Sequence, residues 1–206
     1  MERKVEENRL FENQLLERLS RTNAYVAISA YMVISLAALI IASMQTRVSL
    51  LNQVTLFISG LITFSLTEYV VHRYLYHYPK IGKLKNWAFV VHQFHHDHPN
   101  DAKRLALPLP LALVFAAIFF GLFWLFMGTS APFFFSGFLL GYAGYLLSHY
   151  LIHTLGPSNG VMRYLWIHHS IHHFKDDTKA YGVSSPLWDF IFQSMPAKSL
   201  RNLMKR

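Results

Sequence analysis

Three long stretches without a charged residue dominate the chain. They cover residues 22–46, 48–67 and 105–148, which are 25, 20 and 44 residues long. A bilayer core about 30 Å thick needs roughly 20 apolar helical residues per crossing. The first two stretches therefore suit one span each, and the third suits two, because turn-forming residues from Gly128 to Pro132 interrupt it. The chain is predicted to be an all-α polytopic membrane protein with four transmembrane helices.

The spans are expected at about residues 23–45, 48–70, 105–127 and 132–152, arranged as two hairpins with tight reversals. A single membrane-embedded domain then accounts for residues 1–206. A charged head, residues 1–21, precedes the first span and contains scattered leucines. It is predicted either to lie on the membrane surface as an amphipathic helix or to be a solvated helix. Each hairpin is followed by a polar segment, residues 68–104 and 149–195, and these two segments contain all 12 histidines.

Lysine and arginine indicate the orientation. Of 19 such residues, five lie in the head, six in residues 68–104, seven after Ser148 and one, Arg47, in a hairpin turn. By the positive-inside rule, both termini and both polar segments face the cytoplasm. The net charge of +8 thus follows from topology, and no nucleic-acid partner is expected. The lack of cysteine excludes disulfides, thiolate metal sites and iron–sulfur clusters.

The histidines fall into four clusters with the spacing of metal ligands. Residues at i, i+3 and i+4 share one face of a helix, so each cluster could direct two or three imidazoles at one point. Two residues five apart, His72 and His77, either straddle a helix end or approach two different metals. The predicted ligands are His72, His77, His92, His95, His96, His149, His153, His169, His172 and His173.

Ten ligands exceed the six that one metal can hold and provide five for each of two metals, which predicts a dinuclear site in a histidine-rich helical cap. His98 and His168 lie outside this pattern and are expected to be spare or supporting groups. Imidazole suits zinc, copper, iron and nickel, so the metal stays open. Six carboxylates outside the head are expected to orient the histidines: Glu68, Asp97, Asp101, Asp176, Asp177 and Asp189. Glu68 could instead be a solvated residue at a helix end, and Trp188-Asp189 is expected to fix the last segment against the metal domain.

Four sequence motifs in order resemble those of the fatty acid hydroxylase superfamily of membrane di-iron enzymes, and most closely the fatty acid 2-hydroxylases. They are EYVVHRYLYH, HQFHHDHPNDAKRLALP, GYAGYLLSHYLIH and HHSIHHFKDDTKAYGVSSPLWDFIF, spanning Glu68 to Phe192. The resemblance implies that the ten histidines hold two iron ions, which zinc may replace in isolated protein. It also implies a catalytic-site tyrosine at Tyr145, whereas Leu146 stands where the family commonly has aspartate.

The implied reaction inserts one atom of dioxygen at carbon 2 of a long-chain acyl lipid and uses two external electrons. About 23 residues precede the first span and contain no H-P-G-G haem motif, so a separate donor, a b-type cytochrome or a ferredoxin-like protein, is expected. A basic face could dock it, or could simply reflect the positive-inside rule: Arg73, Lys80, Lys83, Lys85, Lys103 and Arg104. The bacterial inner membrane is favoured over the endoplasmic reticulum.

Three other functions stay open from the sequence. Within the same superfamily, the chain could be a carotenoid hydroxylase or a sterol desaturase or oxidase. In a different class, it could be a membrane protein that binds or transports metal without catalysis. Transport sites, however, place ionisable residues inside the spans, and the middles of all four predicted spans lack charge and histidine.

Overall fold

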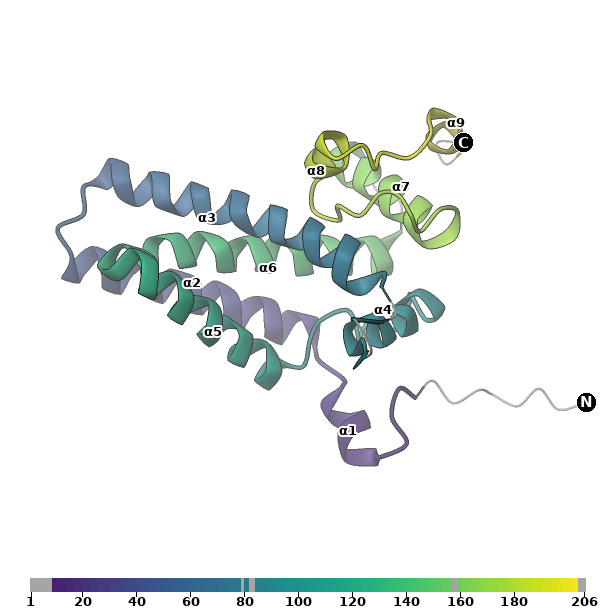
Figure 1. Ribbon diagram of the computed structural model, residues 1–206, viewed down its shortest axis with the longest axis horizontal. Helices are drawn as coiled ribbons and strands as arrows, with labels where there is room; N and C mark the ends of the chain where they lie inside the picture. Colours follow the sequence, from purple (N-terminus) through teal and green to yellow (C-terminus); the bar gives the residue numbers. More distant parts are fainter. Residues whose placement is uncertain (1–8, 79, 82–83, 157–158, 204–206) are drawn as a thin grey trace, which may run out of the picture.

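The described residues include four long helices. Figure 1 shows that they run side by side along the molecule. The computed structural model describes residues 9–78, 80–81, 84–156 and 159–203. The long helices are α2 (Ala24–Gln45), α3 (Leu50–Val70), α5 (Leu109–Met127) and α6 (Ala131–Leu155). A π-helix, η1 (Val71–Tyr76), extends α3, and a 3-10 turn, η2 (Gly128–Ser130), joins α5 to α6.

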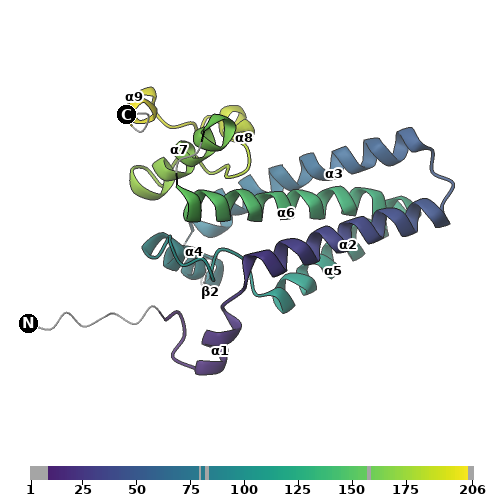
Figure 2. The same cartoon turned by 180° about the vertical axis from the view of Figure 1, so that it is seen from behind.

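The shorter elements gather at one end of the long helices, which Figure 2 shows from behind. They are α1 (Gln14–Leu19), α4 (Trp87–Asp97), α7 (Gly160–Phe174), α8 (Leu187–Ile191) and α9 (Lys198–Leu203). The prediction of an all-α protein needs one small correction, because β1 (Lys80–Ile81) and β2 (Leu84–Lys85) form an antiparallel ladder that pairs Lys80 with Lys85. This ladder is the reversal that leads the chain from η1 back into α4.

Three helical stretches are long and apolar enough to cross a membrane: Ala24–Gln45, Leu50–Tyr76 and Leu109–Leu155. The third is 47 residues long and comprises α5, η2 and α6. Their outward apolar side chains are widely exposed, as with Leu51 and Phe126, which is the pattern of surfaces that meet lipid. These helices occupy the stretches in which spans were predicted, and the number of crossings stays a prediction.

Side-chain caps explain where several helices begin. The side-chain oxygens of Asn13, Asn23, Ser49 and Asn86 accept hydrogen bonds from backbone N–H groups in the first turns of α1, α2, α3 and α4. Such caps satisfy donors that have no partner within the helix. Asn86 also donates to the carbonyl oxygen of Tyr78 over 2.6 Å, so it ties the start of α4 to the end of η1.

The central helix is α6, which packs against α2, α3 and α5. Its contact with α3 depends on two glycines: a Cβ on Gly137 would lie 1.9 Å from the carbonyl oxygen of Phe57, and one on Gly60 would lie 2.0 Å from that of Phe134. Small residues of this kind let apolar helices approach closely where lipid provides no hydrophobic drive for association.

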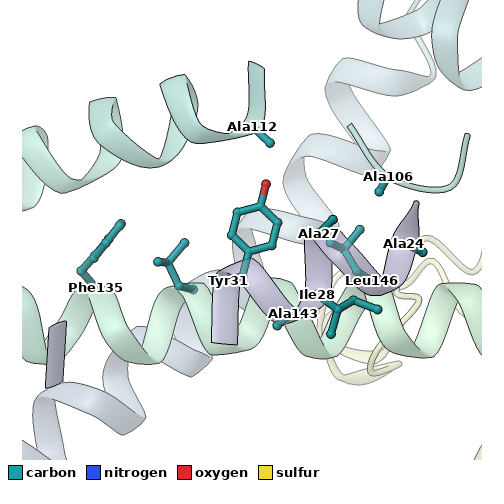
Figure 3. Packing of buried hydrophobic residues seen from close by; sticks show 10 residues of the cluster. Ala24, Ala27, Ile28, Tyr31, Ala106, Ala112, Phe135, Ala143 and Leu146 are labelled. Carbon is teal, nitrogen blue, oxygen red and sulfur yellow. The ribbon is translucent and has the colours of Figure 1, made fainter. Parts of the chain in front are cut away.

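The contact between α2 and α6 combines small and aromatic residues, as Figure 3 shows around Tyr31. Ala24, Ala27 and Ala143 are almost fully buried there. Ser35 and Ser136 add reciprocal hydrogen bonds, in which each hydroxyl donates to the other residue's carbonyl oxygen over 2.8 and 2.9 Å. These contacts fix α2 and α6 in one register.

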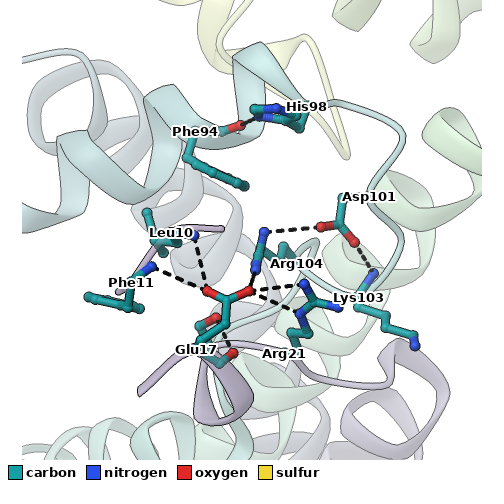
Figure 4. Close-up of polar contacts among 10 residues, drawn as sticks. Leu10, Phe11, Glu17, Arg21, Phe94, His98, Asp101, Lys103 and Arg104 are labelled. Carbon is teal, nitrogen blue, oxygen red and sulfur yellow. Dashed lines mark hydrogen bonds and ion pairs between the residues drawn. The ribbon is translucent and has the colours of Figure 1, made fainter. Parts of the chain in front are cut away.

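Glu17 ties the head of the chain to the segment that follows α4 (Figure 4). Its carboxylate accepts hydrogen bonds from the Leu10 and Phe11 N–H groups and from the guanidinium groups of Arg21 and Arg104. The pKa of Glu17 is lowered, because these hydrogen bonds outweigh the opposing effect of burial. The α1 leucines Leu15, Leu16 and Leu19 stay exposed, and their predicted contact with a membrane surface stays a prediction.

Candidate metal centre

The ten histidines predicted as ligands form two groups of five at the end of the bundle. Group 1 consists of His72, His77, His92, His96 and His172, and group 2 of His95, His149, His153, His169 and His173. In each group, one ligand nitrogen per residue lies within 4.8 Å of all the others. The groups adjoin, because the rings of His96 and His173 stack with centroids 4.2 Å apart. The structure therefore offers two neighbouring points where imidazole nitrogens converge.

The H-x-x-H-H clusters divide between the two groups, which corrects the expectation that each helix directs its imidazoles at one point. Helix α4 provides His92 and His96 to group 1 and His95 to group 2, whereas α7 provides His172 to group 1 and the other two ligands to group 2. Consecutive helical residues are turned by about 100°, so His95 and His96 diverge. One helix can thus serve two metals and fix the distance between them.

The π-helix η1 explains how His72 and His77 reach the same group although they are five residues apart. Hydrogen bonds in a π-helix run from i to i+5, which brings residues at this spacing onto one face. His72 lies in η1 and His77 caps its C-terminus. The prediction that the pair approaches two metals is wrong, and the alternative, a pair straddling a helix end, matches the structure.

Nitrogen–nitrogen distances within the groups indicate a shared cation. Neighbouring Nε2 atoms lie 3.0 to 3.2 Å apart, and Nε2 of His92 is this close to those of three other histidines, His72, His77 and His96. A neutral imidazole nitrogen carries at most one proton, so hydrogen bonding cannot satisfy three such contacts. Ligands about 2.1 Å from a metal and at right angles would be separated by about 3.0 Å. The donor set fits two metal ions.

The ligand histidines of α4 and α7 are held neutral, which is the form that binds metal. Burial, with repulsion from neighbouring imidazolium charges, lowers the pKa of His92, His95, His169, His172 and His173. The pKa of His96 falls to about 4 for the same reasons, burial being the larger. Protons therefore compete weakly for these nitrogens near neutral pH.

The loop between α7 and α8, residues 175–186, orients two ligands of group 1. Nδ1 of His72 donates to the carbonyl oxygen of Tyr181 over 2.5 Å, and Nδ1 of His172 donates to that of Lys179 over 2.8 Å. A carbonyl only accepts, so the proton must be on Nδ1 and the lone pair on Nε2. The loop therefore sets both the tautomer and the ring orientation of these ligands.

Two buried carboxylates hold that loop. Glu68 of α3 accepts hydrogen bonds from the N–H groups of Val183 and Ser184 at 2.6 and 2.9 Å and from the Ser184 hydroxyl. Asp189 of α8 is fully buried and accepts from the N–H groups of Tyr181 and Gly182, the Ser194 hydroxyl and Nε2 of His168. The loop is thus attached to both the bundle and the last segment.

These contacts correct the prediction that carboxylates orient the ligands directly. Backbone carbonyls bond His72 and His172, whereas buried Glu68 bonds, within the part of the chain that the structure describes, the Val183 and Ser184 groups rather than an imidazole. Asp189 does bond a histidine, but it is His168, which belongs to neither group. Asp189 fixes the last segment, as predicted for Trp188-Asp189, and Trp188 contributes by donating to Ser65 of α3.

Three tyrosines lie against the ligands. The predicted Tyr145 stacks on His149 with ring centroids 5.5 Å apart, and its catalytic role stays a prediction. Sequence reasoning missed Tyr76, which stacks on His92, and Tyr181, whose ring lies 5.4 to 5.7 Å from those of His72, His77 and His172. The string AYGVSSPLWD after the last histidine cluster contains Tyr181 and is the signal that could have identified it.

Group 2 differs from group 1 in its surroundings. Among the described residues, no hydrogen-bond partner is found for Nδ1 of His169 or His173. A cavity of about 220 Å³ borders this group and is lined in part by His153, His169 and His173. Three of the five ligands of group 2 therefore border a cavity.

The structure tests only part of the predicted basic docking face. Arg104 is buried and paired with Glu17 and Asp101, so it cannot belong to an exposed face. Arg73 donates to the Tyr69 hydroxyl and packs over the ring of Tyr74. Lys83 and the side chains of Lys80 and Lys85 lie outside the described residues.

Comparison with known proteins gives a consistent match. The model of the fatty acid hydroxylase family matches residues 57–194. The dihydroceramide fatty acyl 2-hydroxylase FAH2 of Arabidopsis thaliana is 31% identical over 93% of this chain and 81% of its own length. The fatty acid 2-hydroxylase of Mus musculus is 35% identical over 68% of this chain, and the ceramide very long chain fatty acid hydroxylase scs7 of Schizosaccharomyces pombe is 37% identical over 68%.

The fold matches as well. A solved structure of full-length scs7p, in which only the hydroxylase domain is visible, aligns with a TM-score of 0.77 and 27% identity over 91% of this chain and 71% of that one. The chain spans less than half the length of the mouse and fission-yeast relatives, at 39% and 42%.

Proposed function

The chain belongs to the fatty acid hydroxylase family, and on that premise we propose that it hydroxylates carbon 2 of a long-chain fatty acyl group in a membrane lipid. The observation that carries the proposal is the pair of adjoining five-histidine groups at one end of an apolar helical bundle. Imidazole-rich sites that lack thiolates suit metals that handle dioxygen, and the bundle suits a substrate with an acyl chain.

The ten histidines would hold two iron ions, one in each group, with zinc able to replace them in isolated protein. When bound, the irons supply the activation of dioxygen for insertion of one oxygen atom into a C–H bond. The chain's own residues hold His72 and His172 in one tautomer and limit the access of water: five of the ten ligands are buried, and His172 is fully so. Tyr145, stacked on His149, is proposed to lie at the catalytic site and to keep that ligand in place.

The bundle is proposed to cross the membrane four times, with α2–α3 and α5–α6 as two hairpins. Residues 1–206 then form one domain, and the head and both histidine segments face the cytoplasm. Support comes from the lysine and arginine distribution and from the reversal at η2, where the chain turns between two long apolar helices. The bacterial inner membrane is the proposed location.

The names of the similar proteins support an acyl lipid as the substrate rather than a carotenoid or a sterol. Their names specify a fatty acid, a dihydroceramide or a ceramide fatty acyl group, which supports acyl 2-hydroxylation over carotenoid or sterol oxidation and over metal transport. The reaction needs two electrons, and we propose that a separate b-type cytochrome or ferredoxin-like protein delivers them.

The test is a lipid analysis in a host that lacks 2-hydroxy lipids. The intact chain, His172→Ala and His98→Ala are expressed with a competent electron donor, and the hydrolysed acyl chains are profiled. His98 is the matched control, since it lies outside both groups and its ring bonds the Phe94 carbonyl and stacks on the Phe94 ring. A 2-hydroxy acid is expected from the intact chain and His98→Ala and not from His172→Ala. An inserted, iron-loaded chain that makes none would overturn the proposal.

A further inference from the structure

The cavity beside group 2 has the position and lining of a site for the reacting end of a lipid. Its lining combines three ligands, His153, His169 and His173, with the apolar Ile152, Trp166 and Phe174, and includes Asn100 among the other polar residues. Binding sites for small molecules commonly combine apolar walls with a few polar groups. None of the group 1 histidines lines it, so its occupant faces group 2.

The depth of the cavity in the proposed membrane arrangement is informative. Its lining includes Ile152, His153 and Gly156, which lie at the end of α6. The uncharged stretch of this helix ends at Ser148, so Ile152 lies about 6 Å beyond it along the helix axis. That is where α6 passes from the hydrocarbon core to the interface, which is also the level of a lipid's carbonyl groups.

The volume limits what the cavity can hold. About 220 Å³ corresponds to roughly seven water-sized volumes of 30 Å³ each, enough for a carbonyl group and a few methylenes. A long acyl chain must therefore leave through the mouth. Two exposed apolar side chains are available to contact that chain, Phe174 in the cavity wall and Leu155, which precedes Gly156 in the sequence.

We infer that this cavity binds the carbonyl end of a membrane lipid's acyl group, with Asn100 at the carbonyl oxygen and the first methylenes against Trp166 and Phe174. The inference rests on the proposed function and deepens it. Carbon 2 is bonded to the carbonyl carbon, so a reactive centre at the interface meets carbon 2 before any carbon deeper in the membrane. Depth in the bilayer, rather than recognition of the chain's far end, selects the position that is oxidised.

The test uses the fluorescence of Trp166. Fatty acids with a nitroxide near the carboxyl group (5-doxyl) or near the methyl end (16-doxyl) are titrated into the full-length protein in detergent. Saturable quenching by the 5-doxyl probe, reversed by excess unlabelled fatty acid, is expected and should disappear in Trp166→Phe. The 16-doxyl probe should quench this component less. Trp124→Phe is the matched control, since Trp124 lies on the exposed face of α5 and its loss should leave the saturable component unchanged.

A second variant pair tests the wall itself. Phe174→Ala is expected to weaken binding of the 5-doxyl probe about tenfold, as loss of a phenyl contact that the bound chain would partly cover implies. Phe126→Ala, an exposed residue at the far end of α5, should leave it unchanged. Saturable quenching that persists in Trp166→Phe, that is absent from the intact chain, or that is stronger with the 16-doxyl probe would overturn the inference. The proposed function would still stand if the intact chain made the 2-hydroxy acid.

Discussion

The two histidine groups have the same number of ligands but different support. In group 1, the loop after α7 bonds His72 and His172, and Glu68 and Asp189 hold that loop. In group 2, no partner among the described residues bonds Nδ1 of His169 or His173, and a cavity adjoins three of the ligands. The comparison indicates a rigid half that keeps its geometry and a second half with room to meet a substrate.

Asp189→Asn is expected to have the largest effect on metal binding by group 1 relative to group 2. Asp189 is fully buried and accepts four hydrogen bonds, one from His168. The amide keeps one acceptor and turns an N–H₂ group towards donors. Each buried donor that is left without an acceptor costs about 1–3 kcal/mol of unfolding free energy. Metal content per chain should fall from two ions towards one, because the loop that orients group 1 is released.

Double variants identify which group has lost its metal. Adding His169→Ala to Asp189→Asn should remove the remaining metal, whereas adding His172→Ala should change little, since both act on group 1. Elemental analysis of the purified protein measures the content. Asp97→Asn is the control, because that exposed carboxylate bonds Gln93 of its own helix. Equal losses from both groups in Asp189→Asn would contradict the assignment of the loop to group 1.

Gly137→Ala should weaken metal binding by both histidine groups to a similar extent. Its new Cβ would lie 1.9 Å from the Phe57 carbonyl oxygen, so α3 and α6 must move apart, and overpacking typically costs about 1–3 kcal/mol. Helix α3 leads into η1 with His72, and α6 carries His149 and His153. Thermal unfolding and metal analysis should show lower stability and loss from both groups together.

Gly144→Ala on the same helix is the matched control, since nothing lies within 4 Å of the added Cβ. If Gly137→Ala removed metal from one group and not the other, the close contact between α3 and α6 would not be what positions both.

Glu68→Gln should weaken metal binding by group 1 alone, and less than Asp189→Asn does. The amide oxygen can still accept from the Val183 and Ser184 N–H groups, but the second carboxyl oxygen, which accepts from the Ser184 hydroxyl, is replaced by an N–H₂ donor. Loss of support of this kind typically weakens metal binding by about 10- to 100-fold. Competition with a chelator should show one weakened ion out of two, with Glu12→Gln, an exposed residue of the head, unchanged. Two equally weakened ions would mean that Glu68 supports the centre as a whole.

Much of the architecture could be predicted because it depends on local patterns. The four long helices follow from uncharged stretches, and the ligand set follows from histidine spacing. The π-helix could not be predicted, since a change from i+4 to i+5 hydrogen bonding leaves no clear sequence signal. The roles of Glu68 and Gly60 depend on partners more than 70 residues away in the chain, and one sequence does not show such pairings.

The smallest effect, and the finest test of the rigid half, is expected from Ala180→Gly. Ala180 lies between Lys179 and Tyr181, whose carbonyls bond His172 and His72, and has a φ of 59°. This left-handed conformation costs a non-glycine residue about 1–2 kcal/mol, and glycine's larger unfolded-state entropy offsets about 0.5–1 kcal/mol of the relief. A small gain in thermal stability is expected. Metal content should not change, because Glu68 and Asp189 hold the loop whatever residue 180 is.

Gln193→Gly, which relieves a φ of 58° away from the ligands, should give a similar gain. A gain in stability accompanied by loss of one metal in Ala180→Gly alone would instead show that the strained alanine itself aims the two carbonyls.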